Sequence, residues 1–172
     1  MAAATALGVP PEYGRSRALQ RVREPRQLVH IGADTQQRAQ FLAPHAARAW
    51  IGLRDAAQRD GVALQVVSAF RSIEYQLGIV RRKVERGLSM EQILAVSAAP
   101  GYSEHHSGRA LDLTTPGFAP LEEEFERSDA FAWLSSNARR FRYYLSYPRG
   151  NRHAIAYEPW HWCWRARPAI RR

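Results

Sequence analysis

Apolar residues recur at helical spacing in two stretches near the middle of the chain. Pro44 suits the first turn of a helix because it has no N–H to leave unpaired, and the apolar residues after it share one face until Gly61. From Ile73 to Val84, apolar residues step by four, three and four positions, and Gly87 follows as a stop signal. These patterns predict two helices, one beginning at Pro44 and one near Ile73.

Two shorter helices are also predicted. Ser89 and Gln92 form the capping-box signature of a helix start, in which each side chain bonds the backbone N–H of the other residue. A second apolar face, from Phe131 to Ala138, steps by three and four and predicts a helix over about 128–139.

Short runs of β-branched and aromatic residues between these helices predict strands. The predicted strands cover 62–70, 109–113, 142–147 and 154–158. The last two flank a turn at 148–151, so we expect them to form a hairpin. This order favours an α+β fold with a small central antiparallel sheet and helices packed around it.

Length and composition fit one compact domain. The chain has 172 residues, of which 45% are hydrophobic, and a chain of this size buries about two thirds of its unfolded surface. We expect an irregular N-terminal lead-in over 1–33, a single domain over 34–165 and a basic tail over 166–172. No run approaches the roughly 20 apolar residues of a membrane span, and no signal peptide is visible at the start.

The net charge of +9 comes almost entirely from arginine, and Lys83 is the one lysine. A basic surface attracts nucleic acid, anionic lipid or anionic cell-wall polymer, but arginine spread over solvated faces explains the charge equally well. None of the arginine clusters resembles a nucleic-acid-binding motif, so we predict no specific nucleic-acid partner. Cys163 is the only cysteine, which excludes an intrachain disulfide and a multi-cysteine zinc site.

Four polar residues have the composition of a catalytic zinc site. Such a site takes three protein ligands and leaves a fourth position for water, and His105, Asp112 and His161 meet this requirement. Glu158 lies three residues before a ligand and is not needed for coordination, so it suits the role of general base. Trp160 would line the site and keep its dielectric constant low.

The motifs around these residues resemble those of the zinc D-alanyl-D-alanine carboxypeptidase family, in the branch of the vancomycin-resistance D,D-carboxypeptidases. The first motif, Ser-x-His-x-x-Gly-x-Ala-x-Asp, is met by Ser103, His105, Gly108, Ala110 and Asp112. The second motif, Glu-x-Trp-His, is met by Glu158, Trp160 and His161. A third element, an arginine after a strand, is present as Arg71 within Ser68–Ser72, with Gln76 behind it.

The resemblance implies a fold of the hedgehog and D,D-peptidase type and one bound Zn²⁺ ion. It implies that His105, Asp112 and His161 are the metal ligands and that Glu158 is the catalytic base. It also implies that Arg71 contacts the substrate, holding a terminal carboxylate or stabilising the oxyanion.

Gln76, Ser103 and Trp160 are the further substrate-binding candidates, although Ser103 could equally shape its loop. His106 would be a ligand only if the register were misread. Cys163, which stands where the family often has arginine, is expected to be a packed thiol.

The expected function is removal of the terminal D-alanine from peptidoglycan stem peptides or precursors by a monomeric metallopeptidase. An L,D-carboxypeptidase or an endopeptidase cleaving L-Ala–D-Glu bonds would keep the same site and remains an alternative. A noncatalytic wall-binding or nucleic-acid-binding protein would be expected to have lost at least one of the four site residues. A wall substrate implies a periplasmic or wall-facing location, and a cytoplasmic precursor substrate is also open.

Overall fold

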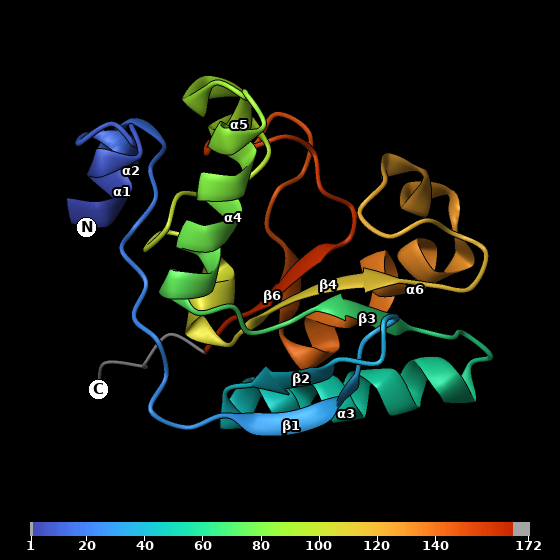
Figure 1. Ribbon diagram of the computed structural model, residues 1–172. Helices are drawn as coiled ribbons and strands as arrows, with labels where there is room; N and C mark the ends of the chain where they lie inside the picture. The colour runs from blue at the N-terminus through green and yellow to red at the C-terminus, as the bar shows by residue number, and fades with distance from the viewer. Residues whose placement is uncertain (1, 167–172) are drawn as a thin grey trace, which may run out of the picture.

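The computed structural model describes residues 2–166 (Figure 1). Except for Ala166, the predicted basic tail lies outside the described residues. In chain order the helices and strands are α1 (Ala2–Ala6), α2 (Tyr13–Ser16), β1 (Val29–Ala33), β2 (Ala39–Leu42), α3 (Pro44–Arg59), β3 (Gln65–Ser68), α4 (Ile73–Glu85), α5 (Met90–Ala95), β4 (Ala110–Thr114), α6 (Asp129–Asn137), β5 (Tyr143–Leu145) and β6 (His161–Trp164). Within residues 2–166, 3₁₀ helices also cover Glu104–Ser107, Glu123–Arg127 and Ala138–Phe141.

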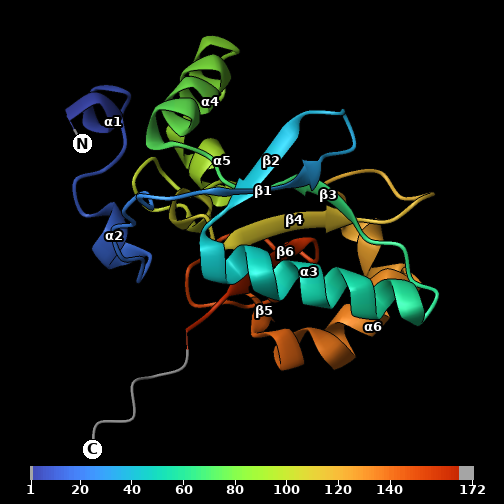
Figure 2. The same cartoon turned by 90° about the horizontal axis from the view of Figure 1, so that it is seen from below.

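The strands form two antiparallel sheets. A central four-stranded sheet has the order β3-β4-β6-β5, and β1 and β2 form a separate hairpin. Helix α3 crosses one side of the central sheet with the hairpin beside it (Figure 2). Helices α4 and α5 lie on the other side, next to α1 and α2 (Figure 1). The predicted α+β fold with a small antiparallel sheet is confirmed.

The predicted helices form where their end signals lie. Pro44 occupies the first turn of α3. The Ser72 side chain accepts a hydrogen bond from the Tyr75 N–H at the start of α4, and Ser128 does the same at α6. The capping box of Ser89 and Gln92 is present in full at α5. Each cap satisfies backbone N–H groups that have no partner within the helix.

Alternation along β4 and β6 separates the core from the site. Because successive side chains of a strand point to opposite faces, Leu111 and Trp162 point into the main hydrophobic core, where they pack with Trp50 of α3. Asp112 and His161, which are paired in the register of β4 and β6, point to the opposite face. The sheet therefore carries a packed core on one face and polar chemistry on the other.

Two expectations about the ends of the domain need correction. The predicted strand over 154–158 is wrong: the Ala156 N–H bonds the Ala95 carbonyl and the Glu158 N–H bonds the Tyr147 carbonyl, which leaves no strand ladder. The partner of β5 is instead β6, reached through a long loop. The lead-in is also less irregular than expected, since it contains α1, α2 and β1.

The N-terminal segment packs against the domain. Tyr13 and Tyr102 meet edge to face with ring centroids 5.3 Å apart, and both belong to a second apolar cluster with residues of α4 and α5. The Val22 N–H bonds the Gly101 carbonyl at 2.8 Å. No helix among residues 2–166 is long and apolar enough to cross a membrane.

Candidate metal centre

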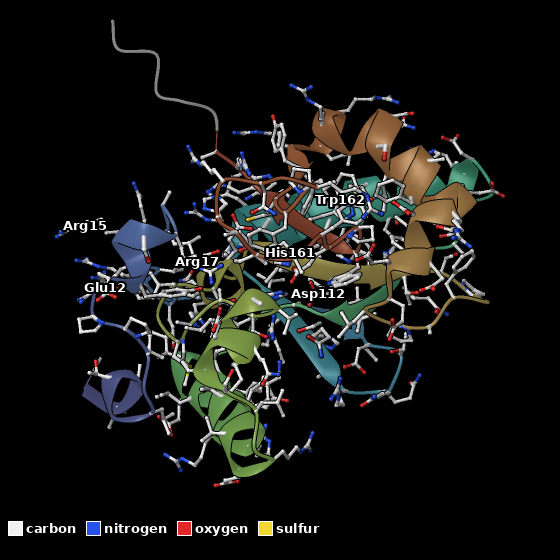
Figure 3. All side chains as sticks on the ribbon, turned by 90° about the horizontal axis from the view of Figure 1, so that it is seen from above. Glu12, Arg15, Arg17, Asp112, His161 and Trp162 are labelled. Atoms are coloured by element: carbon white, nitrogen blue, oxygen red, sulfur yellow. The ribbon has the colours of Figure 1, made fainter. Side chains whose placement is uncertain are left out.

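Three side chains from separate elements converge on the polar face of the sheet. His105 lies in the 3₁₀ helix that precedes β4, Asp112 lies in β4 and His161 begins β6. One potential ligand atom from each lies within 4.8 Å of the others, and all three residues are buried. Figure 3 shows Asp112 and His161 together near the centre of the molecule. The structure thus brings together the three predicted metal ligands.

The ring of His105 is held with one nitrogen toward the cluster. Its Nδ1 atom lies 2.5 Å from the Ala69 carbonyl oxygen, so Nδ1 carries the proton and donates it. The buried Nε2 atom has no hydrogen-bond partner among the described residues and lies 3.2 Å from Asp112 Oδ2. A nitrogen lone pair thus faces a carboxylate oxygen, an unfavourable arrangement that a bound cation would resolve.

His161 is held between carboxylates. Its Nδ1 atom lies 3.0 Å from Asp112 Oδ1 and 3.7 Å from Glu158 Oε2. Its Nε2 atom lies 3.0 Å from Glu104 Oε2. A carboxylate on the outer nitrogen of a metal-binding histidine orients the ring and increases its basicity.

Glu104 was not predicted, because it occupies a variable position of the first motif. An acidic residue directly before a candidate ligand was the available signal, but the sequence does not reveal that this carboxylate reaches His161, 57 residues away.

The side chains of the cluster set one another's pKa values. Burial lowers the pKa of His105 to about 4, with help from the positive charge of Arg71. Burial also opposes the charge on His161, but its hydrogen bonds to Asp112 and Glu104 outweigh this and raise its pKa to about 10. For Asp112, the two histidines overcome the effect of burial and hold the pKa well below its usual range. At neutral pH the site therefore carries a negative Asp112 carboxylate beside a protonated His161, and a divalent cation bound by both would displace the His161 proton.

Glu158 lies at the edge of this cluster. Burial raises the pKa of its carboxyl to about 7, against the lowering effect of the His161 charge. A general base works best with a pKa near the working pH. The two imidazole nitrogens and one carboxylate, with a further carboxylate alongside, match the donor set of a catalytic zinc site with an open position.

Arg71 reaches the cluster from the segment between β3 and α4. Its Nη1 atom lies 3.4 Å from Gln76 Oε1 and its Nη2 atom lies 3.8 Å from Asp112 Oδ2. Its buried Nε atom has no hydrogen-bond partner among the described residues. The His106 Nδ1 atom bonds the Arg71 carbonyl at 2.7 Å, and His106 Nε2 accepts from the Gly101 N–H. Both ring nitrogens of His106 thus form hydrogen bonds with backbone groups, so His106 holds the surrounding backbone in place and is not a metal ligand.

A cavity of about 480 Å³ opens over the cluster. Its walls include every predicted site residue, namely Arg71, Gln76, Ser103, His105, Asp112, Glu158, Trp160 and His161. Ser103 is itself buried, and its hydroxyl accepts a hydrogen bond from the His105 N–H at 3.4 Å, so it also shapes the loop. Gln76 donates to the Ala98 carbonyl at 3.1 Å. Cys163 is a buried thiol whose pKa is raised by burial, as expected for a packed cysteine.

Comparison with protein families decides the affiliation. The model of the VanY family, described as D-alanyl-D-alanine carboxypeptidase, matches residues 39–167. The chain belongs to this family. This confirms the resemblance inferred from the motifs.

Curated relatives of this VanY-family chain include two bacterial proteins. The putative carboxypeptidase YodJ of Bacillus subtilis (strain 168) is 34% identical over 126 residues, which are 70% of this chain and 45% of YodJ. A D-alanyl-D-alanine carboxypeptidase of Enterococcus faecalis is 34% identical over 120 residues, which are 64% of this chain and 43% of that protein. The chain thus spans less than half the length of these curated relatives.

Solved structures of VanY-type and LdcB-type peptidases share the fold. The LdcB LD-carboxypeptidase has a TM-score of 0.73 and 29% identity, covering 82% of this chain and 69% of its own. A variant of the VanY D,D-pentapeptidase from a VanB-type resistance cassette, solved with Zn(II), has a TM-score of 0.64 and 26% identity, covering 87% of each chain. VanYB in complex with D-alanine-D-alanine has a TM-score of 0.65 and 25% identity, covering 87% of this chain and 86% of its own. These neighbours confirm the predicted fold type.

Proposed function

We propose that this chain is a zinc-dependent D-alanyl-D-alanine carboxypeptidase that removes the terminal D-alanine from peptidoglycan stem peptides or their precursors. The observation that carries the proposal is the orientation of the two histidines. Ala69 and Glu104 each occupy one ring nitrogen, so the other nitrogen of each ring faces Asp112. Membership of the VanY family, a neighbour solved with Zn(II) and another solved with D-alanine-D-alanine support the metal and the substrate.

His105, Asp112 and His161 would hold one zinc ion. A zinc ion in such a site supplies a Lewis acid that lowers the pKa of water toward 7 and polarises a carbonyl. The chain's own contribution begins with Glu158, whose buried carboxylate can take a proton and return it to the leaving amine.

Arg71 supplies the fixed positive charge of the cavity. Its guanidinium can pair with the carboxylate of a peptide terminus or stabilise the negative charge that develops on the carbonyl oxygen. Gln76 contacts this guanidinium and helps to set its direction. Ser103 and Trp160 complete the cavity wall, and Trp160 reduces the access of water.

An L,D-carboxypeptidase is the second candidate, because the LdcB LD-carboxypeptidase has a TM-score of 0.73, against 0.64 and 0.65 for the two VanY structures. It would use the same residues on the bond between an L-centre and a terminal D-alanine. The two candidates differ in the residue that precedes the cleaved bond, which the cavity walls must accommodate.

The deciding experiment incubates zinc-loaded protein with defined pentapeptide and tetrapeptide stems and identifies the products by mass spectrometry. Release of D-alanine from the pentapeptide, lost in Glu158→Gln with its zinc content unchanged, is the expected result. Release only from the tetrapeptide would move the assignment to the L,D-carboxypeptidase. Cleavage only between L-Ala and D-Glu would indicate the endopeptidase, and no cleavage by the zinc-loaded protein would overturn the enzymatic proposal. Glu124→Gln, a change at an exposed carboxylate, is the matched control.

A further inference from the structure

The one lysine of the chain faces the proposed substrate cavity. Gln76, Ile79 and Lys83 lie at positions i, i+3 and i+7 of α4, and all three line the same cavity as Glu158. This spacing puts them on one face of the helix. The neighbouring Arg82 is exposed and is not part of the cavity wall.

The ammonium of Lys83 is only partly used by the protein. Its Nζ atom donates to Ser97 Oγ at 3.1 Å. Among the described residues, no carboxylate lies within 4.0 Å of it. An ammonium carries three N–H donors, so two remain for a ligand.

Arg71 is a second cation in the wall of the same cavity. Burial and the positive charge of Arg71 lower the pKa of Lys83, while the charge of Glu158 opposes them. Glu158 offsets only part of these effects, because the pKa of Lys83 stays below its usual value, and an anionic ligand in the cavity would stabilise both cations. The Arg71 guanidinium already contacts Gln76 and approaches Asp112, whereas Lys83 has only a neutral hydroxyl. Lys83 therefore has donors available for an anionic partner in addition to those of Arg71.

We propose that Lys83 binds a carboxylate of the peptide substrate, in addition to the group bound by Arg71. This inference rests on the proposed function and deepens it, because it assigns a second cation of the cavity to recognition of the peptide substrate. Gln76, which contacts Arg71, and Lys83 are seven residues apart on α4, or about 10 Å along the helix axis. An extended peptide rises about 3.3–3.6 Å per residue, so a peptide segment of about three residues spans this stretch of the cavity wall.

The carboxylate has two possible sources on such a peptide. It is either the C-terminal α-carboxylate, with Arg71 then acting on the carbonyl oxygen, or a carboxylate carried by a residue upstream of the cleaved bond. The chemistry of recognition is the same in both cases. Peptides in which one carboxylate or the other is converted to a carboxamide separate the two sources.

The test measures Kd by calorimetry with zinc-loaded Glu158→Gln protein, in which bound peptides are not expected to be cleaved. Four forms of one peptide are compared: both carboxylates free, only the upstream one amidated, only the terminal one amidated, and both amidated. Each peptide is titrated into four proteins that all carry Glu158→Gln. One has no further change, and the others add Lys83→Met, Lys83→Arg or the control Arg82→Met. Loss of a charge-assisted hydrogen bond is expected to weaken binding of the dicarboxylate about 10- to 100-fold in Lys83→Met.

The pattern of losses decides the proposal. Lys83→Met should weaken binding of the peptide with both carboxylates free. If amidation of one carboxylate removes this weakening and amidation of the other does not, the carboxylate whose amidation removes it is the partner of Lys83. Equal weakening of all four peptides, or weakening of none, overturns the inference. Lys83→Arg and Arg82→Met are both expected to keep the affinity for the dicarboxylate peptide. If Arg82→Met weakens binding of this peptide as much as Lys83→Met does, the effect comes from the overall charge of α4 and the inference is overturned.

Hydrolysis of a stem peptide by the unmodified protein is scored separately. Hydrolysis without any coupling between Lys83 and a carboxylate would reject this inference and leave the proposed function standing. If the effect of Lys83→Met depends on one carboxylate but the unmodified protein does not hydrolyse the stem peptide, the proposed function is rejected and the binding role of Lys83 stands.

Discussion

Glu104 Oε2 lies 3.0 Å from His161 Nε2, on the side of the imidazole opposite the nitrogen that faces Asp112. The pair joins the first residue of the 3₁₀ helix Glu104–Ser107 to the first residue of β6. Burial would raise the pKa of Glu104, but the hydrogen bond and charge of His161 outweigh it and lower the pKa to about 2. Glu104 is therefore a fixed anion that keeps the His161 Nδ1 atom directed at the metal cluster.

We predict that Glu104→Ala weakens zinc binding about 10- to 100-fold, the usual cost of losing a residue that supports a metal ligand. Glu104→Gln should lose less, since its amide oxygen can still accept from the Nε2–H group. Competition with a chromogenic chelator measures both. Glu124→Ala is the control because that carboxylate is exposed. Equal affinities of Glu104→Ala and the unmodified protein would refute the role of Glu104.

Zinc binding should release protons, with a pH dependence set by His161. Its pKa of about 10 in the metal-free protein means that this imidazole is charged between pH 7 and 9. A metal on Nδ1 must displace a proton, so we predict release of about one proton per ion and a roughly tenfold rise in affinity per pH unit in this range. Calorimetry in two buffers of different ionisation enthalpy counts the protons. Release of none would contradict the assignment of His161 as a ligand.

The same groups predict how the stability of the metal-free protein changes with pH. His161 has a folded-state pKa above its unfolded value, so its stabilisation is complete below about pH 6.5 and is lost as the pH rises toward 10. His105 has the opposite shift, so it costs stability as the pH falls from about 6.5 through 4. Glu158 opposes the effect of His105 on the acid side, because its folded-state pKa of about 7 lies above the usual value and its carboxyl gains stability as the pH falls over nearly the same range. The melting temperature of chelator-treated protein should therefore fall as the pH rises from about 6.5 toward 10. A melting temperature that rises from pH 7 to 10 would contradict the account of His161.

Much of the fold follows from local signals. The helix beginning at Pro44 and the helix near Ile73 each have an apolar face and a clear end signal in the sequence, and both form. The strand predicted over 154–158 failed because alternation over five residues is weak evidence. Ile155 instead packs with Tyr147 and Ala98 in a small cluster, a tertiary contact that the local pattern does not encode.

The metal cluster was predictable because its residues are tied to short, spaced motifs. Glu104 and Lys83 carry no such motif. Their importance comes from the approach of distant segments: Glu104 meets a ring 57 residues away, and Lys83 shares a cavity with Glu158. A sequence lists these charges but does not tell which face a side chain occupies, and a solvated surface position is the usual outcome for each.

Glu158 should cost stability in the metal-free protein. Its folded-state pKa of about 7 lies above the usual value, so folding is penalised as the pH rises from about 4.5 to 7, and the full penalty remains above pH 7. We predict that Glu158→Gln raises the melting temperature of chelator-treated protein at pH 8 by about 5 °C, with no gain at pH 4. Differential scanning calorimetry at both pH values tests this. An equal gain at both would mean that the carboxylate charge is not the cause.

Gly108 links the 3₁₀ helix that carries His105 to the strand that carries Asp112. Its backbone has φ +63°, and a Cβ there would lie 2.9 Å from the backbone nitrogen of Ala43, whose N–H bonds the Gly108 carbonyl at 2.8 Å. The left-handed conformation costs a residue with a Cβ about 1–2 kcal/mol, and overpacking adds about 1–3 kcal/mol. Because the turn sets the distance between two ligands, we expect Gly108→Ala to lower both the unfolding free energy and the zinc affinity.

Gly117 provides the matched control for this substitution. It has φ +90°, and a Cβ added there would meet no atom within 4 Å, so Gly117→Ala carries the conformational cost without the clash. Chemical denaturation should show a loss about 1–3 kcal/mol larger for Gly108→Ala than for Gly117→Ala. Chelator competition should show weaker zinc binding only for Gly108→Ala, because Gly117 lies beyond the end of β4 and away from the ligands. If both variants lose the same stability and keep full zinc affinity, the close approach to Ala43 does not position the ligands.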